Sequence, residues 1–185
     1  MNLRSILLVA SLFVGIQVAA LLFLGQPLIC ECGDIKIWAG AVASSDTSQH
    51  ITDWYTFSHV IHGVAFFALL SVLFPRLSIG KRFLIALAIE IGWEIVENTP
   101  MVIEHYRQQA LALGYVGDSI LNSLSDTLAM ALGFVAAIRL PVWLIVALIV
   151  AFEAFTLYMV RDGLILSIIG LVHVFPAISA WQAGI

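Results

Sequence analysis

Charged residues are scarce in this sequence, and its lysines and arginines do not gather into a run. Only 11% of the residues are charged, with 8 Lys and Arg against 12 Asp and Glu, for a net charge of −4. A nucleic-acid-binding surface needs a basic patch, which this chain does not offer. The sequence also shows neither the internal repeat found in many transporters nor an HExxH-type metal signature. Nucleic acid is therefore excluded as a partner, and any metal site must be assembled from distant residues.

Apolar residues dominate the chain instead. They make up 62% of the sequence, and the mean hydropathy is +1.05, outside the usual range of soluble proteins. Because a membrane-spanning helix needs about 20 residues, the 185 residues have room for about six. We therefore predict an all-α, polytopic membrane helix bundle in a single integral membrane domain, 1–185, with about six transmembrane helices and five possible.

The expected spans are about 5–25, 54–74, 79–98, 117–138, 141–160 and 163–181. His173 and Pro176 could reduce the last of these to a kinked or partial span. Between the third and fourth spans, apolar residues at helical spacing within 101–116 predict a short amphipathic helix on the membrane surface.

The distribution of Lys and Arg in the short loops predicts the orientation. With six spans, one face receives five of them and the other receives Lys36, Arg107 and Arg161. Because cytoplasmic loops are enriched in Lys and Arg, we expect an inner-membrane protein with both termini in the cytoplasm.

Polar residues then fall at one depth on four helices. At 1.5 Å of rise per residue, seven of them lie roughly 6 to 13 Å below the outer face: His59, His62, Glu90, Glu94, Asn122, Asp126 and, on the fifth span, Glu153. Their spacing places each set on one side of its helix. The sets are His59 and His62; Glu90, Glu94 and Glu97; and Asp118, Asn122 and Asp126. Because charged groups are costly in lipid, we expect these faces to meet inside the bundle and form a polar pocket open to the outside.

The residue types in this pocket are those of a metal site. His59, His62, Glu94 and Asp126 suit a divalent ion such as zinc or manganese. Glu94, Glu97, Asp118 and Asn122 are candidates for acid–base catalysis or for support of the ligands. The depth favours a lipid or lipid-linked substrate, with Asn98, Arg161 and Asp162 as candidate substrate-binding residues at the outer rim. These assignments predict a metal-dependent hydrolase or transferase.

Other readings of the same residues remain open. Single groups such as Glu90 or Glu153 could serve only as interhelical hydrogen-bonding groups, and Arg161 and Asp162 could form a simple ion pair. The pocket could also line a proton- or cation-coupled carrier or channel, or meet a protein partner in an accessory subunit. Cys30 and Cys32 could bind metal, be oxidised or be incidental, although a disulfide across so short a loop is expected to be strained.

Several stretches also carry a resemblance. "WYTFSHVIHGVAFF", "GWEIVENTPMVIEHYR", "GDSILNSLSDTLAMALGF" and "VRDGLILSIIGL" together resemble an uncharacterised family of small multi-pass inner-membrane proteins of proteobacteria. This resemblance covers nearly the whole chain and implies an inner-membrane location without an activity. More distantly, Asp118, Asn122 and Asp126 followed by Gly133 are similar to the VanZ-like membrane proteins, whose pattern does not include the histidine and glutamate elements.

Overall fold

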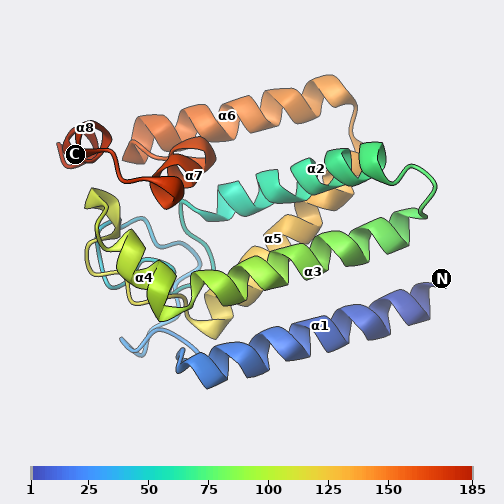
Figure 1. The fold of residues 1–185 in the computed structure, drawn as a ribbon, viewed down its shortest axis with the longest axis horizontal. Helices are drawn as coiled ribbons and strands as arrows, with labels where there is room; N and C mark the ends of the chain where they lie inside the picture. The colour runs from blue at the N-terminus through green and yellow to red at the C-terminus, as the bar shows by residue number, and fades with distance from the viewer. Residues whose placement is uncertain (1, 185) are drawn as a thin grey trace.

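The protein is a bundle of long helices with short helices packed across one end (Figure 1). A computed structural model describes residues 2–184. The long helices are α1 (Leu3–Leu24), α2 (Thr56–Leu73), α3 (Ile79–Glu97), α5 (Ile120–Arg139) and α6 (Val142–Val160). The short ones are α4 (Pro100–Tyr106), the 3-10 turn η1 (Ala110–Ala112), α7 (Leu164–Val172) and α8 (Pro176–Gln182). Within residues 2–184 extended pairing is limited to one bridge, Trp38 to Thr52. The predicted all-α membrane bundle is thereby confirmed.

The long helices follow the predicted hydrophobic segments to within about three residues at each end. Four of them, α1, α2, α5 and α6, are long and apolar enough to cross a membrane. Helix α3 has 19 residues and is comparable in length, but it carries two basic and three acidic residues, because it supplies part of the polar pocket. The short helix expected in 101–116 also forms, as α4, with Pro100 in its first turn.

The sixth segment departs from the prediction of a sixth span. It forms two helices of 9 and 7 residues, α7 and α8, separated by a break at His173–Phe175. Each is shorter than the roughly 20 residues that a span requires. The segment therefore takes the partial form, because Pro176 lacks the N–H that a continuous helix would use and begins a new helix instead.

This break corrects the expected position of the C-terminus. With five long helices in alternating directions, the start of α1 and the end of α8 lie at opposite ends of the bundle (Figure 1). The prediction that both termini share one side is wrong for this arrangement. The break does not change the five long helices. The loops between them therefore still alternate between the two faces as assigned from the sequence.

Helices α2 and α5 pack closely because each presents a glycine to the backbone of the other. A Cβ atom added at Gly63 would lie 1.9 Å from the carbonyl oxygen of Met130, and one at Gly133 would lie 2.0 Å from the carbonyl oxygen of Val60. Small residues allow such close approach, and this is a principal way in which helices associate in lipid. The pairing brings the histidine face of α2 against the aspartate face of α5.

An apolar cluster fills the bundle between this crossing and the end where α1 begins. Its buried members come from α2, α3 and α5: Leu70, Ala86, Leu87, Ile91, Met130 and Phe134. The core of this half therefore contains no charged side chain among its buried members, and the polar groups concentrate in the other half.

The loop from 25 to 55 is bound to the start of α5 by backbone hydrogen bonds. The first amides of α5 lack partners within the helix, and loop carbonyls accept from them: Ser119 N donates to Ser48 O at 2.9 Å, and Ile120 N donates to Pro27 O at 2.8 Å. In the same loop Cys30 and Cys32 are joined in a disulfide, which resolves the alternatives left open for them.

Candidate functional site

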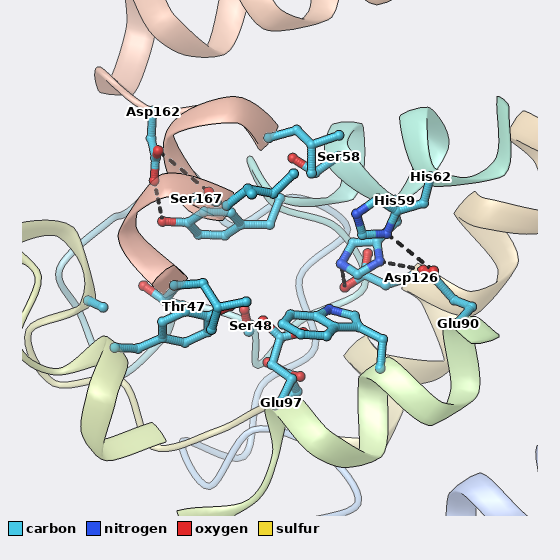
Figure 2. Close-up of a pocket in the computed structure, with 18 of the residues that line it drawn as sticks. Thr47, Ser48, Ser58, His59, His62, Glu90, Glu97, Asp126, Asp162 and Ser167 are labelled. Carbon is cyan, nitrogen blue, oxygen red and sulfur yellow. Dashed lines mark hydrogen bonds and ion pairs between the residues drawn. The ribbon is translucent and has the colours of Figure 1, made fainter. Parts of the chain in front are cut away.

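A cavity of about 440 Å³ lies at the loop end of the bundle. Helices α2, α3, α5 and α7 form its walls, and the loop residues Thr47 and Ser48 form part of its rim (Figure 2). Seven histidines and carboxylates from these helices and their ends line it: His59, His62, Glu90, Glu97, Asp118, Asp126 and Asp162. The predicted convergence of α2, α3 and α5 on one pocket is therefore found in the structure.

Glu90 is the centre of this arrangement. Its Oε1 lies 2.6 Å from Nδ1 of His59, and its Oε2 lies 3.2 Å from Nδ1 of His62 (Figure 2). One carboxylate therefore binds both rings through the same ring atom. In neutral rings this places the proton on Nδ1 and leaves a lone pair on each Nε2. Neither Nε2 has a hydrogen-bond partner within residues 2–184.

Asp126 lies on the Nε2 side of His59. Its Oδ2 is 3.9 Å from His59 Nε2, while its Oδ1 accepts a hydrogen bond from the Thr56 hydroxyl at 3.0 Å. The Thr56 oxygen in turn accepts from the backbone N–H of Asp53 at 3.1 Å. This chain of hydrogen bonds orients the aspartate and leaves Oδ2 free to bind a ligand.

Glu94 approaches His59 from the other edge of the ring. Its Oε2 accepts from the Ser123 hydroxyl at 2.6 Å. Its Oε1 lies 3.4 Å from His59 Nδ1 but is buried without a hydrogen-bond partner in residues 2–184. Donor atoms of His59, Glu94 and Glu97 lie within 4.8 Å of one another, as do those of His59, His62 and Glu90. Of the four predicted metal ligands, His62 and Glu94 therefore fall in separate groups with His59, and Asp126 falls in neither group among the described residues; it lies beside His59 Nε2 alone.

Asp118 lines the cavity, and its carboxylate and backbone bind Asn98. Asn98 Nδ2 donates to Asp118 Oδ2 at 2.6 Å, and its Oδ1 accepts from the Asp118 backbone N–H at 2.7 Å. The Tyr115 hydroxyl donates to Asp118 Oδ1 at 2.8 Å. Burial raises the pKa of Asp118 to about 6, although these two side-chain hydrogen bonds oppose the shift. This pair joins the end of α3 to the start of α5.

The remaining predicted residues are placed separately. Asn122 is fully buried, does not line the cavity, and donates to the backbone oxygen of His50 at 2.9 Å. Arg161 turns away, with Nη1 donating to the Trp181 backbone oxygen at 2.6 Å. Asp162 does line the cavity and accepts from Tyr55 and Gly163 at 3.4 and 2.9 Å. Burial raises its pKa to about 6.

The site has the donors of a divalent metal centre and an excess of negative charge. No Lys or Arg lines the cavity in the described part of the chain, so cations or protons must balance the buried carboxylates. Two ligands of a tetrahedral zinc ion lie roughly 3.3 Å apart, which the 3.9 Å between His59 Nε2 and Asp126 Oδ2 approaches. Metal-bound histidines usually donate their other ring N–H to a carboxylate, and Glu90 accepts in this way from both. The residues therefore include possible metal-site groupings, His59 with His62 and Glu90 and His59 with Glu94 and Glu97.

Sequence reasoning placed Glu90 in the polar pocket but gave it no role as a metal ligand or catalytic residue. Its position four residues before Glu94 places both on one face of α3, which was the available signal. That signal does not reveal that Glu90 faces both histidines of α2, because the pairing depends on the register between two helices.

The fold and the site together define an all-helical protein with four helices long and apolar enough to cross a membrane and a cavity lined by histidines and carboxylates. The chain belongs to the family described as "Protein of unknown function (DUF2585)", whose model matches residues 21–184. It is 52% identical over 175 residues to a "UPF0314 protein" of Paracoccus denitrificans, covering 94% of this chain and 91% of the relative.

Further relatives are similar over comparable lengths. A "UPF0314 protein" of Sphingopyxis alaskensis is 48% identical, with 96% of this chain and 94% of the relative covered. One of Brucella anthropi is 43% identical, with 96% and 90% covered. These proteobacterial relatives confirm the resemblance to an uncharacterised family. They do not include VanZ-like proteins, so that similarity rests on the spacing of the α5 residues alone. No solved structure matches the chain.

Proposed function

We propose that this protein is a metal-dependent hydrolase or transferase of the inner membrane that acts on a lipid or lipid-linked substrate. The observation that carries the proposal is the single carboxylate of Glu90 bound to Nδ1 of both His59 and His62. This arrangement directs the lone pairs of two imidazoles away from Glu90, and Asp126 Oδ2 lies beside one of them. Two histidines and a carboxylate are a common ligand set of catalytic metal sites, which keep a further position open.

In this proposal the metal is zinc or manganese, held by His59, His62 and Asp126. Because no group of three donor atoms within 4.8 Å of one another includes Asp126 among the described residues, these side chains must move to close around the ion. The bound ion would supply a Lewis acid and activate a water molecule. Glu90 holds the two rings in their orientation, and Thr56 holds Asp126. The remaining carboxylates, Glu94 and Glu97, have donor atoms within 4.8 Å of an atom of His59 and accept or return protons.

A lipid substrate is supported by where the cavity meets the surface. Ala65 of α2 and Ile89 of α3 line the cavity and are exposed on the outside of the bundle. Phe66 and Trp93 continue this apolar wall. Because these residues lie within long apolar helices, an acyl chain could enter from the membrane while its polar group reaches the histidines. His62, six residues into α2, lies about 9 Å below the helix start, where lipid headgroup linkages are found.

The orientation follows from the basic residues at the two ends of the bundle. The start of α1, the connection from α2 into the first turn of α3 and the end of α5 lie at the end of the bundle away from α7 (Figure 1), and the sequence places Arg4, Arg76, Lys81, Arg82 and Arg139 in these segments. Positive loops face the cytoplasm, so the cavity opens toward the periplasmic side, and the C-terminal end of α8 lies there as well.

Two features weigh against the other readings. A carrier needs a polar route through the membrane, whereas the apolar cluster around Phe134 fills the other half of the bundle. An accessory subunit would offer its polar face to a partner, whereas Glu90 and Glu94 are only 0% and 1% exposed and face inward.

Turnover on membranes tests the proposal. The purified protein is mixed with liposomes of a proteobacterial lipid extract, with added Zn²⁺ or Mn²⁺ or with a chelator, and products are followed by mass spectrometry. We expect metal-dependent loss of a lipid species that His62→Ala and Asp126→Ala abolish. The matched control is His173→Ala, since His173 is exposed and outside the cavity. Absence of any metal-dependent product, or equal activity in all variants, would contradict the proposal.

A further inference from the structure

A second chemical centre lies in the loop between α1 and α2. Cys30 and Cys32 form a disulfide there, and donor atoms of both cysteines, Asp46 and His50 lie within 4.8 Å of one another. None of these residues lines the cavity, so the cluster is separate from the metal site.

The two sulfur atoms have different surroundings. Cys30 is 5% exposed, and its Sγ accepts a hydrogen bond from the backbone N–H of Cys32 at 3.2 Å. Cys32 is exposed. An external thiol can therefore reach Cys32, while the sulfur of Cys30 already lies against a hydrogen-bond donor. Thiol–disulfide exchange requires an accessible sulfur to attack and a stabilised sulfur to leave.

His50 provides the second observation. Its ring is buried, and Nδ1 accepts from the backbone N–H of Lys36 at 3.3 Å. A neutral ring with an accepting Nδ1 carries its proton on Nε2. That Nε2 atom is buried without a hydrogen-bond partner within residues 2–184, and its nearest carboxylate oxygen, on Asp46, is 3.8 Å away. An unsatisfied buried donor is costly, and a thiolate is a far better acceptor than a disulfide sulfur.

The charged residues around His50 do not occupy its Nε2–H, which stays available to bind a thiolate. Lys36 Nζ binds Asp46 Oδ2 at 2.7 Å, and this hydrogen bond holds the pKa of Asp46 below its usual value. Asp46 therefore stays ionised with its charge balanced by Lys36. Glu31, between the two cysteines, is exposed and hydrated, so it opposes a nearby thiolate only weakly.

We propose that Cys30 and Cys32 are a redox-active pair that exchanges its disulfide with an external dithiol, and that His50 stabilises the Cys30 thiolate of the reduced form. A thiolate of the dithiol attacks Sγ of Cys32, the bond between the two cysteines breaks, and Cys30 leaves as a thiolate. The second thiol of the dithiol, as its thiolate, then attacks the first sulfur of the same dithiol, which is bound to Cys32 in the mixed disulfide. Cys32 is released as a thiolate.

The exchange transfers two electrons and two protons. The dithiol is oxidised to a cyclic or intramolecular disulfide, and Cys30 and Cys32 become thiols. The reverse reaction uses the same atoms. The reaction needs no metal and no lipid, so its test is independent of the proposed hydrolase or transferase activity.

The chain offers a clean readout because it contains only 2 cysteines. The full-length protein in detergent is equilibrated with mixtures of reduced and oxidised dithiothreitol, and free thiols are trapped with a maleimide and counted by mass. We expect no modified cysteine in the oxidised protein and two in the reduced protein. The change should be reversible and should leave the helical content unchanged. A pair that resists excess dithiothreitol in the folded protein would overturn the proposal.

The role of His50 is tested on the reduced protein through the pH dependence of its alkylation by iodoacetamide. We expect a thiol pKa below the ordinary value of about 8.5. His50→Phe keeps a buried ring but removes the N–H, and it should raise that pKa by roughly one to two units, since hydrogen bonds to charges are worth about 1.5 to 3 kcal/mol. His173→Phe, a change at an exposed histidine, should leave it unchanged.

An ordinary thiol pKa in the wild type would overturn this role of His50, even if His50→Phe does not fold. An equal pKa in His50→Phe and wild type would overturn it as well. His50→Gln, which keeps a side-chain N–H, should behave more like the wild type than His50→Phe does.

Discussion

Replacing Gly63 with alanine should separate α2 from α5 and weaken both the fold and the proposed metal site. The new Cβ would lie 1.9 Å from the carbonyl oxygen of Met130, against about 3.5 Å for a favourable contact between heavy atoms. Because the nearest atoms belong to the backbone of α5, no side-chain rotation can relieve the clash. The helices must therefore move apart by more than about 1 Å.

The expected cost follows from this displacement. Overpacking a close contact costs roughly 1 to 3 kcal/mol, and sometimes more. For a chain of this length, 1 kcal/mol shifts the Tm by about 2 to 4 °C, so Gly63→Ala should lower the Tm by roughly 2 to 12 °C. His59 and Asp126 lie on the two separated helices, 3.9 Å apart between Nε2 and Oδ2, so metal binding should weaken as well.

Gly92→Ala is the matched control. It lies in α3, and an added Cβ there meets no atom within 4 Å, so alanine should be neutral or stabilise the helix by up to about 1 kcal/mol. Thermal unfolding in detergent, followed by circular dichroism, compares the two variants. Equal Tm values for Gly63→Ala and Gly92→Ala would refute the close glycine packing of α2 on α5.

Three further changes have defined outcomes. Glu90→Gln cannot accept hydrogen bonds from both rings, so metal affinity measured by competition with a fluorescent chelator should fall by about 10- to 100-fold; unchanged affinity would contradict the orienting role. Asp162, with its pKa raised to about 6, holds its proton more firmly in the folded state than in the unfolded state. Its contribution to stability is therefore present below about pH 4 and lost as pH rises to about 6, by roughly 3 kcal/mol at most. Asp162→Asn should flatten this part of a Tm–pH curve, and an identical curve would argue against the burial of this carboxyl group. Glu153→Gln removes the carboxylate that accepts from Leu164 N at 2.8 Å at the start of α7, which should cost roughly 0.3 to 1 kcal/mol. Amide exchange in the first turn of α7 should then accelerate while α2 stays protected, and no local change would contradict the capping role.

The long helices could be predicted from the sequence because each is a hydrophobic run of membrane length between loop signals. The convergence of the polar residues could also be predicted, since each set has helical spacing and a similar depth. The break in the last segment was foreseeable only as an alternative. His173 and Pro176 mark it, but whether a proline kinks or divides a helix depends on what packs around it.

The partners of individual side chains could not be predicted. Glu90 meets both histidines only because of the register between α2 and α3, which the sequence does not show. Arg161 was expected near the substrate, but its backbone has a φ of 54° at the end of α6, and its guanidinium binds Trp181 instead. Asn122 shares a face with Asp126, yet it lies one helical turn closer to the loop and binds the backbone of His50.

The metal content of the purified protein tests the central claim most directly. The wild type, His62→Ala and Asp126→Ala are purified in detergent without chelators or metal-affinity resins, and bound metals are quantified by elemental mass spectrometry, with His173→Ala as the control. The account predicts about one zinc or manganese ion per chain in the wild type and the control, and its loss in the other two variants. A metal-free wild-type protein that also fails to bind added Zn²⁺ or Mn²⁺, with all variants folded, would contradict it.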